Sequence, residues 1–276
     1  MTHAALLALG DRSAILLDEG VGGGCISQAR HIRTERGEYF LKTHRTNFFG
    51  AEAHGLGLLR EAGALAIPRV LSVGSDYILL EWIESSGGPR FEALGRGLAQ
   101  LHRHQESLFG LERDGFIGAT AQENGCMDDW GAFFGERRLG AQARFAKENG
   151  RWNSWRESRL ERLRGRLDEL LPRSPEASLL HGDLWGGNVM GGPDGDPFLI
   201  DPAVYYGDRE TDIAFSQLFG GFSPAFYEAY REAWPLDPGW EERFEIYNLY
   251  HLLNHLNLFG EGYGGGVDRI LERFGN

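Results

Sequence analysis

The chain has 276 residues, of which 42% are hydrophobic and 12% aromatic, and its formal net charge is −12. This acidity argues against nucleic acid as a partner, since phosphate backbones are bound by concentrated Lys and Arg surfaces. No apolar run approaches the ~18 residues of a membrane span, and the run from Ala4 to Leu9 lacks a signal peptide's layout. The two cysteines are too few for a disulfide framework. We therefore expect a cytoplasmic protein without a membrane partner.

The first ninety residues predict a small β-rich unit that holds one helix. Strands are expected over residues 25–32, 39–43, 69–73 and 77–83, with a glycine turn at 21–24. A helix is predicted over residues 50–62, because Ala53, Leu56 and Leu59 recur on one face and Gly63 follows as a stop. The stretch SSGGP at 85–89 then breaks the pattern. We place a boundary there, between an N-terminal unit of residues 1–84 and a C-terminal unit of residues 85–276.

The C-terminal unit is predicted to be mainly helical. Phe91, Leu94, Leu98 and Leu101 mark the first helix, and further helices are expected over 128–148, 154–171 and most of 209–274. A non-helical island at 178–201 interrupts them, with a hairpin-like turn at 191–197 between two short apolar runs. This island holds the residues that are most informative about chemistry.

The sequence HGDLWGGN at residues 181–188 has the spacing of a kinase catalytic loop. His181, Asp183 and Asn188 match the H-R-D-x-x-x-x-N pattern, with Gly182 in place of Arg. Phosphoryl transfer needs a carboxylate that orients the attacking hydroxyl and accepts its proton, and metal ions that neutralise developing charge. We therefore predict Asp183 as the general base and Asn188 as a ligand of Mg²⁺. Asp201, which ends the next apolar run, is predicted as the second Mg²⁺ ligand.

A lysine and a glutamate in the N-terminal unit predict contacts to ATP. Lys42 lies in an expected strand and Glu52 near the start of the expected helix, which is the layout of the lysine that contacts the α- and β-phosphates and the glutamate that holds it. A P-loop is excluded, because the sequence has no G-x-x-x-x-G-K-[ST]. The other predicted nucleotide contacts are the backbone amides of Gly22, Gly23 and Gly24, and backbone groups of a hinge at Glu81 and Ile83.

These motifs resemble the fructosamine kinase (ketosamine 3-kinase) family, a relative of aminoglycoside phosphotransferases and choline kinases. The resemblance rests on GGGCI at 22–26, FGAEAHGL at 49–56, DW at 129–130, FF at 133–134, HGDLWGGN, DPAVYYG at 201–207 and RE at 209–210. It implies an α+β, two-lobed protein-kinase-like fold, with a five-stranded antiparallel sheet and one main helix before a mainly helical lobe. It also implies ATP-dependent phosphorylation of the sugar 3-hydroxyl of a ketosamine, either a small molecule or a glycated lysine.

Several residues are candidates for supporting or substrate roles. His181 is expected to brace the catalytic loop, and Asp212 to cap loop amides, with substrate contact as the alternative. Trp185 either walls the sugar site or anchors its loop. Trp240 and His255 are candidates for the acceptor site from an aromatic and polar stripe in the last helices, although most such stripes are core. Two open points remain: Cys25 is either redox-responsive or a strand filler, and Asp208, where many relatives carry His, bears on substrate choice at most.

Two rival hypotheses stay open at this point. A kinase of the same fold could act on an aminoglycoside or an amino alcohol, and a substrate panel separates these acceptors. A nucleotide-binding pseudokinase is the rival from another class, but such proteins typically lose a residue of the phosphate machinery. Here Lys42, Asp183, Asn188 and Asp201 are all present. The sequence leaves undecided which ketosamine is preferred, whether it is free or protein-bound, and the oligomeric state.

Overall fold

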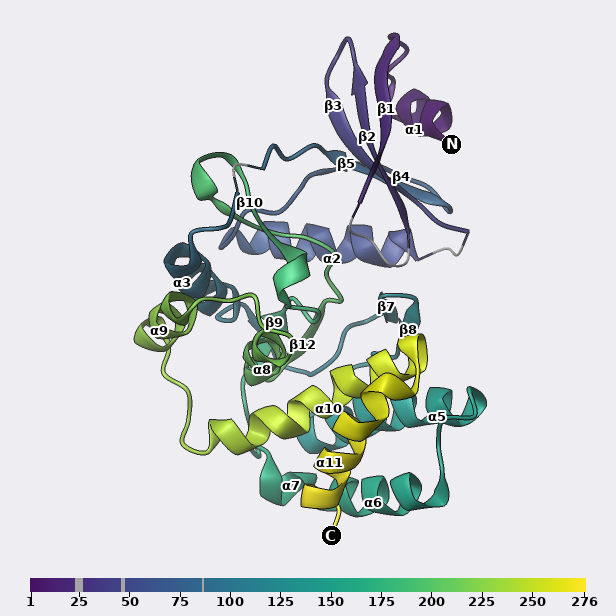
Figure 1. The fold of residues 1–276 in the computed structure, drawn as a ribbon. Coiled ribbons are helices and arrows are strands. Elements are labelled where there is room, and N and C mark those ends of the chain that lie inside the picture. The colour runs from purple at the N-terminus through teal and green to yellow at the C-terminus, as the bar shows by residue number, and fades with distance from the viewer. Residues whose placement is uncertain (23–26, 46–47, 86) are drawn as a thin grey trace.

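The computed structural model describes residues 1–22, 27–45, 48–85 and 87–276, which form an upper sheet lobe and a lower helical lobe (Figure 1). The N-terminal lobe comprises α1 (Thr2–Leu9), β1 (Ile15–Val21), β2 (Gln28–Thr34), β3 (Glu38–Thr43), α2 (Phe49–Ala62), β4 (Val70–Val73) and β5 (Tyr77–Glu81). Its strands form one sheet of order β1-β2-β3-β5-β4, in which every neighbouring pair is antiparallel. The expected five-stranded antiparallel sheet with one main helix is confirmed, and the boundary at residue 84 stays a prediction.

The two faces of the sheet are covered by different partners, because side chains alternate along a strand. On β3, Tyr39 and Leu41 face a small core with Ala5 and Leu6 of α1. Phe40 faces the other way, against the main core to which Phe49, Leu56 and Leu59 of α2 belong. Lys42, two residues after Phe40, therefore points toward α2. Neither α1 nor β1 was predicted, since α1 is short and β1 is partly exposed along its length.

The C-terminal lobe is mainly helical, as expected. Its helices are α3 (Phe91–Leu101), α4 (Trp130–Phe133), α5 (Ala141–Glu148), α6 (Ser154–Arg164), α7 (Leu167–Leu170), α8 (Glu210–Leu218), α9 (Pro224–Ala233), α10 (Trp240–Phe259) and α11 (Gly264–Phe274). A π-helical segment, Phe134–Gly140, joins α4 to α5, so the single helix predicted over 128–148 has three parts. Among the described residues, no helix is both long and apolar enough to span a membrane.

Short strands in this lobe form the non-helical framework of the site. They are β6 (Gln105–Glu106), β7 (Gly115–Ile117), β8 (Thr120–Gln122), β9 (Ala177–Leu180), β10 (Val189–Gly191), β11 (Pro197–Leu199) and β12 (Tyr205–Gly207). β10 pairs with β11 as the expected hairpin, and β9 lies between β12 and β6. The hairpin of β7 and β8 was not predicted. It touches the N-terminal lobe, where the Phe116 and Phe48 rings lie 5.8 Å apart.

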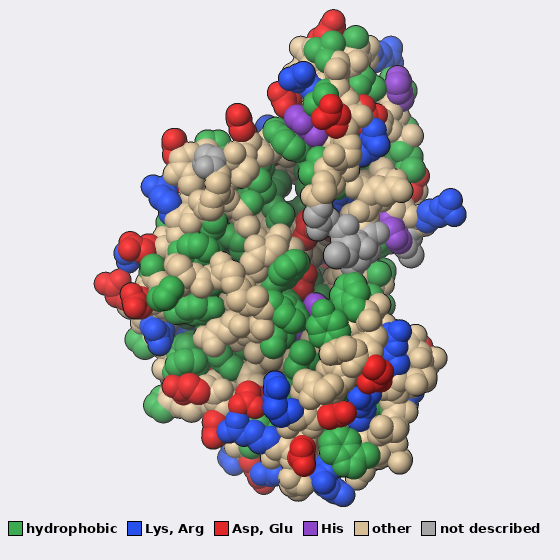
Figure 2. Space-filling view, in the orientation of Figure 1, with side chains coloured by type: hydrophobic (Ala, Val, Ile, Leu, Met, Phe, Trp, Pro, Cys, Tyr) green, Lys and Arg blue, Asp and Glu red, His purple; other side chains and the backbone are tan. Residues whose placement is uncertain are grey.

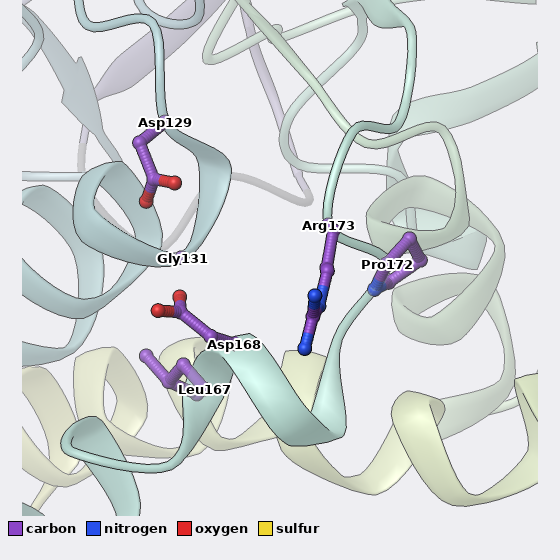
Figure 3. A pocket seen from close by; sticks show the side chains of 6 residues that line it. All are labelled: Asp129, Gly131, Leu167, Asp168, Pro172 and Arg173. Carbon is purple, nitrogen blue, oxygen red and sulfur yellow. The ribbon is translucent and has the colours of Figure 1, made fainter.

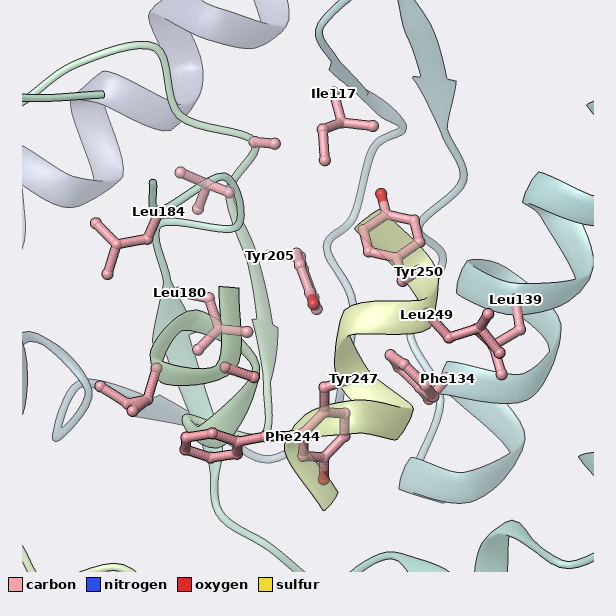
Figure 4. Close-up of a cluster of buried hydrophobic side chains, with 14 of the residues drawn as sticks. Ile117, Phe134, Leu139, Leu180, Leu184, Tyr205, Phe244, Tyr247, Leu249 and Tyr250 are labelled. Carbon is pink, nitrogen blue, oxygen red and sulfur yellow. The ribbon is translucent and has the colours of Figure 1, made fainter. Parts of the chain in front are cut away.

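Aromatic side chains fill the core beneath the site (Figure 4). Tyr205, Tyr247, Tyr250 and Phe134 are all fully buried and come from three different segments of the lobe. The ring of Tyr247 meets that of Phe134 edge-on, at 5.3 Å between centroids. Tyrosine hydroxyls in such a core need hydrogen-bond partners. Here the Tyr247 hydroxyl donates to Asp208 and the Tyr250 hydroxyl donates to Gln122.

Asp208 is one of these buried polar partners. It accepts a hydrogen bond from the Tyr247 hydroxyl (2.5 Å) and another from the Glu210 N–H (2.9 Å), and only 3% of its surface is exposed. It is not among the described residues that line the large cavity discussed below. Burial and then the charge of Glu210 raise the pKa of Asp208 to about 7.

The raised pKa of Asp208 predicts that the protein loses stability as the pH rises from about 4 to about 7. In that window the folded carboxyl keeps its proton while the unfolded one has lost it, so deprotonation favours unfolding. Asp208→Asn cannot ionise and is expected to flatten this part of the dependence of Tm on pH. Thermal unfolding in a buffer series measures it, with Asp128→Asn on an exposed turn as the control. Parallel curves for Asp208→Asn and the parent would contradict the prediction.

Candidate active site

A cavity of about 930 Å³ lies between the sheet and α2 above and the helical lobe below. Figure 2 shows a hollow at this level, with hydrophobic side chains gathered around it. Most of the residues predicted for the site line it: Gly22, Lys42, Glu52, Glu81, Ile83, Asp183, Trp185, Asn188, Asp201 and His255. The predictions at Gly23, Gly24 and Cys25 fall outside the described residues.

A second, smaller cavity of about 340 Å³ lies elsewhere, beside α4 and α7. Figure 3 shows the carboxylates of Asp129 and Asp168 facing each other across it, with Arg173 on another side. Asp129 accepts a hydrogen bond from the Ala132 N–H (2.6 Å) and so caps α4. No predicted site residue is among its described lining, and we assign the chemistry to the large cavity.

Lys42 links three elements at the centre of the large cavity. Its Nζ donates to Glu52 Oε1 of α2 at 2.7 Å, and also to Asp201 Oδ1, which belongs to the other lobe. Burial by itself would lower the pKa of Lys42, but the charges of Asp201 and Glu52 outweigh it and hold the pKa above its usual value. The lysine is therefore a buried cation held between two carboxylates.

Asp183 and Asn188 lie at opposite ends of the catalytic loop and meet through a hydrogen bond. Asn188 Nδ2 donates to Asp183 Oδ2 (2.8 Å) and to the Asp183 carbonyl (2.8 Å). Because the amide nitrogen is used in this way, the amide oxygen of Asn188 is left to accept from a ligand. Together with the Asp201 carboxylate it makes a set of hard oxygen donors. Such a set fits Mg²⁺, which proteins hold with one or two side chains and the substrate's phosphates.

The protonation of Asp183 suits a proton acceptor. Burial raises the pKa of Asp183 to about 7, against the opposing effect of the hydrogen bond from Asn188. A base is most effective when its pKa lies near the working pH, because it is then both largely ionised and basic enough to take a proton. The sequence motif predicted the position of this carboxylate, whereas the pKa depends on the surrounding fold.

Asp212 and His181 hold the backbone of the catalytic loop from behind. Asp212, in the first turn of α8, accepts hydrogen bonds from the N–H groups of His181 (2.7 Å) and Gly182 (2.9 Å). His181 Nδ1 accepts from the Asp183 N–H (3.2 Å), so its Nε2–H donates to the Ile200 carbonyl (3.0 Å). Burial lowers the pKa of His181, which favours this neutral form. Both side chains are placed to support the loop, and neither is among the described lining of the cavity.

Gly182 shows why this loop has no arginine after its histidine. Its φ is +79°, and a Cβ at this position would lie 2.0 Å from the Ala203 carbonyl oxygen. Only glycine fits a left-handed backbone packed so closely against another chain segment. Asp201 also has a positive φ, of 55°, which is uncommon for a residue with a side chain. The catalytic loop and the turn after Asp201 thus pack in direct contact, with Gly182 against the Ala203 carbonyl.

Gln122 is a site residue that the sequence reasoning missed. Its Nε2 donates to the Ala203 carbonyl (3.0 Å), and its Oε1 accepts from the Tyr250 hydroxyl (2.9 Å). The side chain is buried and belongs to β8, a three-residue strand with no clear pattern. It ties the turn that carries Asp201 to α10. No signal in the local sequence distinguishes it from a surface glutamine.

Gln122→Leu is expected to lower kcat by about tenfold and the free energy of unfolding by about 2 kcal/mol. The change leaves the Ala203 carbonyl and the Tyr250 hydroxyl without their partner, and it frees the turn that positions Asp201. Gln122→Glu, which still accepts from Tyr250 but cannot donate to Ala203, tests the contact to Ala203 by itself. Steady-state kinetics and denaturant unfolding give both quantities. A full kcat in both variants would show that Gln122 does not position the turn.

The residues predicted for the hinge and the acceptor site line the large cavity, with the exception of Trp240. The Glu81 N–H donates to the Arg69 carbonyl (3.0 Å), so this N–H is already engaged. The Arg69 guanidinium in turn donates to the Glu81 carboxylate (2.6 Å). His255 and Trp185 line the cavity, but Trp240 is absent from its described lining and packs on Phe244, with ring centroids 4.8 Å apart. Trp240 opens α10, and fifteen residues of helix place it roughly 22 Å from His255. The stripe therefore extends beyond the described lining of this cavity, and a substrate role for Trp240 stays a prediction.

The fold and this site together define a class of protein. The choline kinase LicA of Streptococcus pneumoniae, at 17% identity, shares the fold with a TM-score of 0.67, covering 94% of this chain and 92% of its own. Two features characterise kinases of the protein-kinase-like fold. The first is a buried lysine–carboxylate pair in the sheet lobe, and the second is a loop below it in which an aspartate precedes an asparagine by five residues.

Within that class, the chain belongs to the fructosamine kinase family, whose model matches residues 2–275. The "Probable ketoamine kinase" of Enterococcus faecium is 44% identical over 92% of this chain and 94% of its own. The chloroplastic protein-ribulosamine 3-kinase of Arabidopsis thaliana is 36% identical over 98% and 86%. The crystal structure of the "putative fructosamine-3-kinase" of Haemophilus somnus has a TM-score of 0.88 at 31% identity, covering 99% of this chain and 95% of that one.

Proposed function

We propose that this protein is an ATP- and Mg²⁺-dependent kinase that phosphorylates the sugar 3-hydroxyl of ketosamines. The observation that carries the proposal is the convergence of Lys42, Asp183, Asn188 and Asp201 on one cavity. The family membership and the names of its relatives, ketoamine kinase and protein-ribulosamine 3-kinase, support ketosamines as the acceptor class.

Each residue of the site has its own role in phosphoryl transfer. Lys42 holds the α- and β-phosphates of ATP, while Glu52 keeps the lysine in place. Asp183 orients the acceptor hydroxyl and takes its proton as the hydroxyl oxygen bonds to the γ-phosphorus and ADP leaves. Asn188 and Asp201 would hold Mg²⁺, which when bound neutralises the charge that develops on the phosphates.

The product of this reaction would be a ketosamine 3-phosphate. Such a phosphate is labile and can decompose to release the free amine, so the activity would reverse sugar adducts on amines. The acceptor is then either a small metabolite or a lysine adduct, and both share the same sugar end. The choice between them depends on the part of the cavity beyond the sugar.

A panel of acceptors tests the proposal. Fructosyl and ribulosyl amines, an aminoglycoside and an amino alcohol are each incubated with the protein, ATP and Mg²⁺, with coupled detection of ADP. We expect turnover with the ketosamines, and a new ³¹P NMR resonance that couples to the proton on the sugar C3. Turnover of the aminoglycoside or the amino alcohol alone would reject the ketosamine assignment. Turnover by Asp183→Asn at the parent rate would reject the site.

A further inference from the structure

One part of the cavity wall consists of aromatic side chains and adjoins the catalytic loop. Phe219, which follows α8, and His255 and Phe259 of α10 line this part together with Tyr263. We call these four residues the aromatic rim. A Cβ on Gly186 of the catalytic loop would lie 3.2 Å from the carbonyl oxygen of Gly220, the residue after Phe219. Phe219 is 41% exposed and Phe259 is 50% exposed. Large exposed aromatic side chains that continue an active-site cavity are a typical mark of a binding surface.

The rings of the aromatic rim contact one another and form a single surface. The His255 ring lies 4.7 Å from Phe219, 5.0 Å from Tyr263 and 5.4 Å from Phe259, measured between centroids. Phe259 and Tyr263 complete the set at 6.2 Å. Because neighbouring rings restrict one another, the surface is largely formed before a ligand binds, and binding loses little side-chain entropy.

The aromatic rim is uncharged. His255 Nδ1–H donates to the His251 carbonyl (2.8 Å), and burial lowers the pKa of His255, so the neutral ring is favoured. Ring faces of this kind attract methylene chains, other rings and cations, and they offer nothing to an anion. In the described wall of the cavity, the Lys and Arg side chains are Lys42 and Arg113. Lys42 is assigned to the phosphates of ATP, and Arg113 pairs with Glu112 at 3.3 Å.

We propose that the aromatic rim binds the substituent carried by the acceptor's amine and selects extended methylene or aromatic substituents over short or anionic ones. This inference rests on the proposed function. When the sugar hydroxyl meets Asp183, the amine and its substituent must extend away from the nucleotide, and the rim is an exposed aromatic surface beside the loop that carries Asp183. A lysine adduct carries such a substituent, since four methylenes separate its amine from the backbone.

Two synthetic ketosamines that differ only in this substituent test the proposal. We expect the wild type to have a kcat/KM about tenfold higher for fructosyl-hexylamine than for fructosyl-methylamine, mainly through KM, because the added methylenes are partly buried on the rim. Phe259→Ala and Phe219→Ala are expected to reduce this ratio several-fold, and Phe259→Tyr to keep it. Trp155→Ala removes a ring of similar exposure on α6, outside the described cavity lining, and should leave the ratio unchanged.

The outcomes separate the inference from the function on which it rests. A wild-type ratio near one, or a ratio that neither alanine variant changes, would overturn the role of the rim while ketosamine turnover stands. A fall in kcat alone, equal for both amines, would also overturn it, since it would indicate a general structural effect. If neither these amines nor the ribulosyl amines of the acceptor panel are phosphorylated, the proposed function and the inference fail together.

Discussion

Asp183→Asn is expected to lower kcat by roughly 10²- to 10⁴-fold, the range typical for loss of a general base. The amide cannot take a proton at neutral pH, but it has the same shape and still offers an oxygen to Asn188. ATP binding should therefore persist, because Lys42 is untouched. Single-turnover phosphorylation measures the chemical step, and nucleotide titration measures the binding.

Thermal unfolding supplies the control for this variant. Burial raises the pKa of Asp183, which means that the fold holds the ionised carboxylate at some loss of stability. We expect Asp183→Asn to have a Tm equal to or above that of the parent, as is common when an active-site charge is removed. A lower Tm with partial unfolding would leave the low rate unrelated to proton transfer, and phosphorylation at the parent rate would refute the assigned role.

Lys42→Ala is expected to lower kcat/KM for ATP by roughly 10²-fold or more, because the phosphates lose a buried, charged donor. The substitution also leaves Glu52 and Asp201 facing each other without their shared cation. Removing one member of a buried ion cluster in this way costs about 3 kcal/mol of stability. Kinetics across ATP concentrations and denaturant unfolding determine the two effects separately.

A second variant distinguishes lost phosphate contacts from lost stability. In Lys42→Ala combined with Glu52→Gln, one of the unpaired carboxylates is neutral, so stability should recover while kcat/KM for ATP stays low. Lys147→Ala breaks the exposed pair with Glu157 (2.6 Å) and should change neither quantity by much, since surface pairs contribute little. Recovery of activity in the double variant would contradict the assignment of Lys42 to the phosphates.

The motif residues were predictable because spacing along the chain constrains them. Asp183 and Asn188 share one loop, and Asp201 follows one hairpin later, so short connections bring the three together whatever surrounds them. Lys42 was predictable from strand alternation and a fixed offset to the α2 glutamate. Gln122 was not, because its two partners, Ala203 and Tyr250, are distant in sequence and its own strand has three residues.

Periodicity along α10 does not distinguish the part of the helix that lines the cavity from the part that does not. Trp240 and His255 lie in one aromatic stripe of α10, but only the C-terminal end of the helix reaches the cavity. The rim partners of His255, Phe219 and Tyr263, come from segments on either side of that helix. A stripe on a helix identifies a face, and the packing of other elements decides which part of that face meets a ligand.

By itself, the sequence determined the class of the protein, its family and the order of its chemical groups, because these depend on local spacing and on the turns that connect short elements. The tertiary structure decided the properties that depend on distant neighbours. These are the pKa of Asp183, the sharing of Lys42 by carboxylates from both lobes, the glycine required at 182, and the aromatic rim. Burial and charge act through space, and residues far apart in the chain supply both.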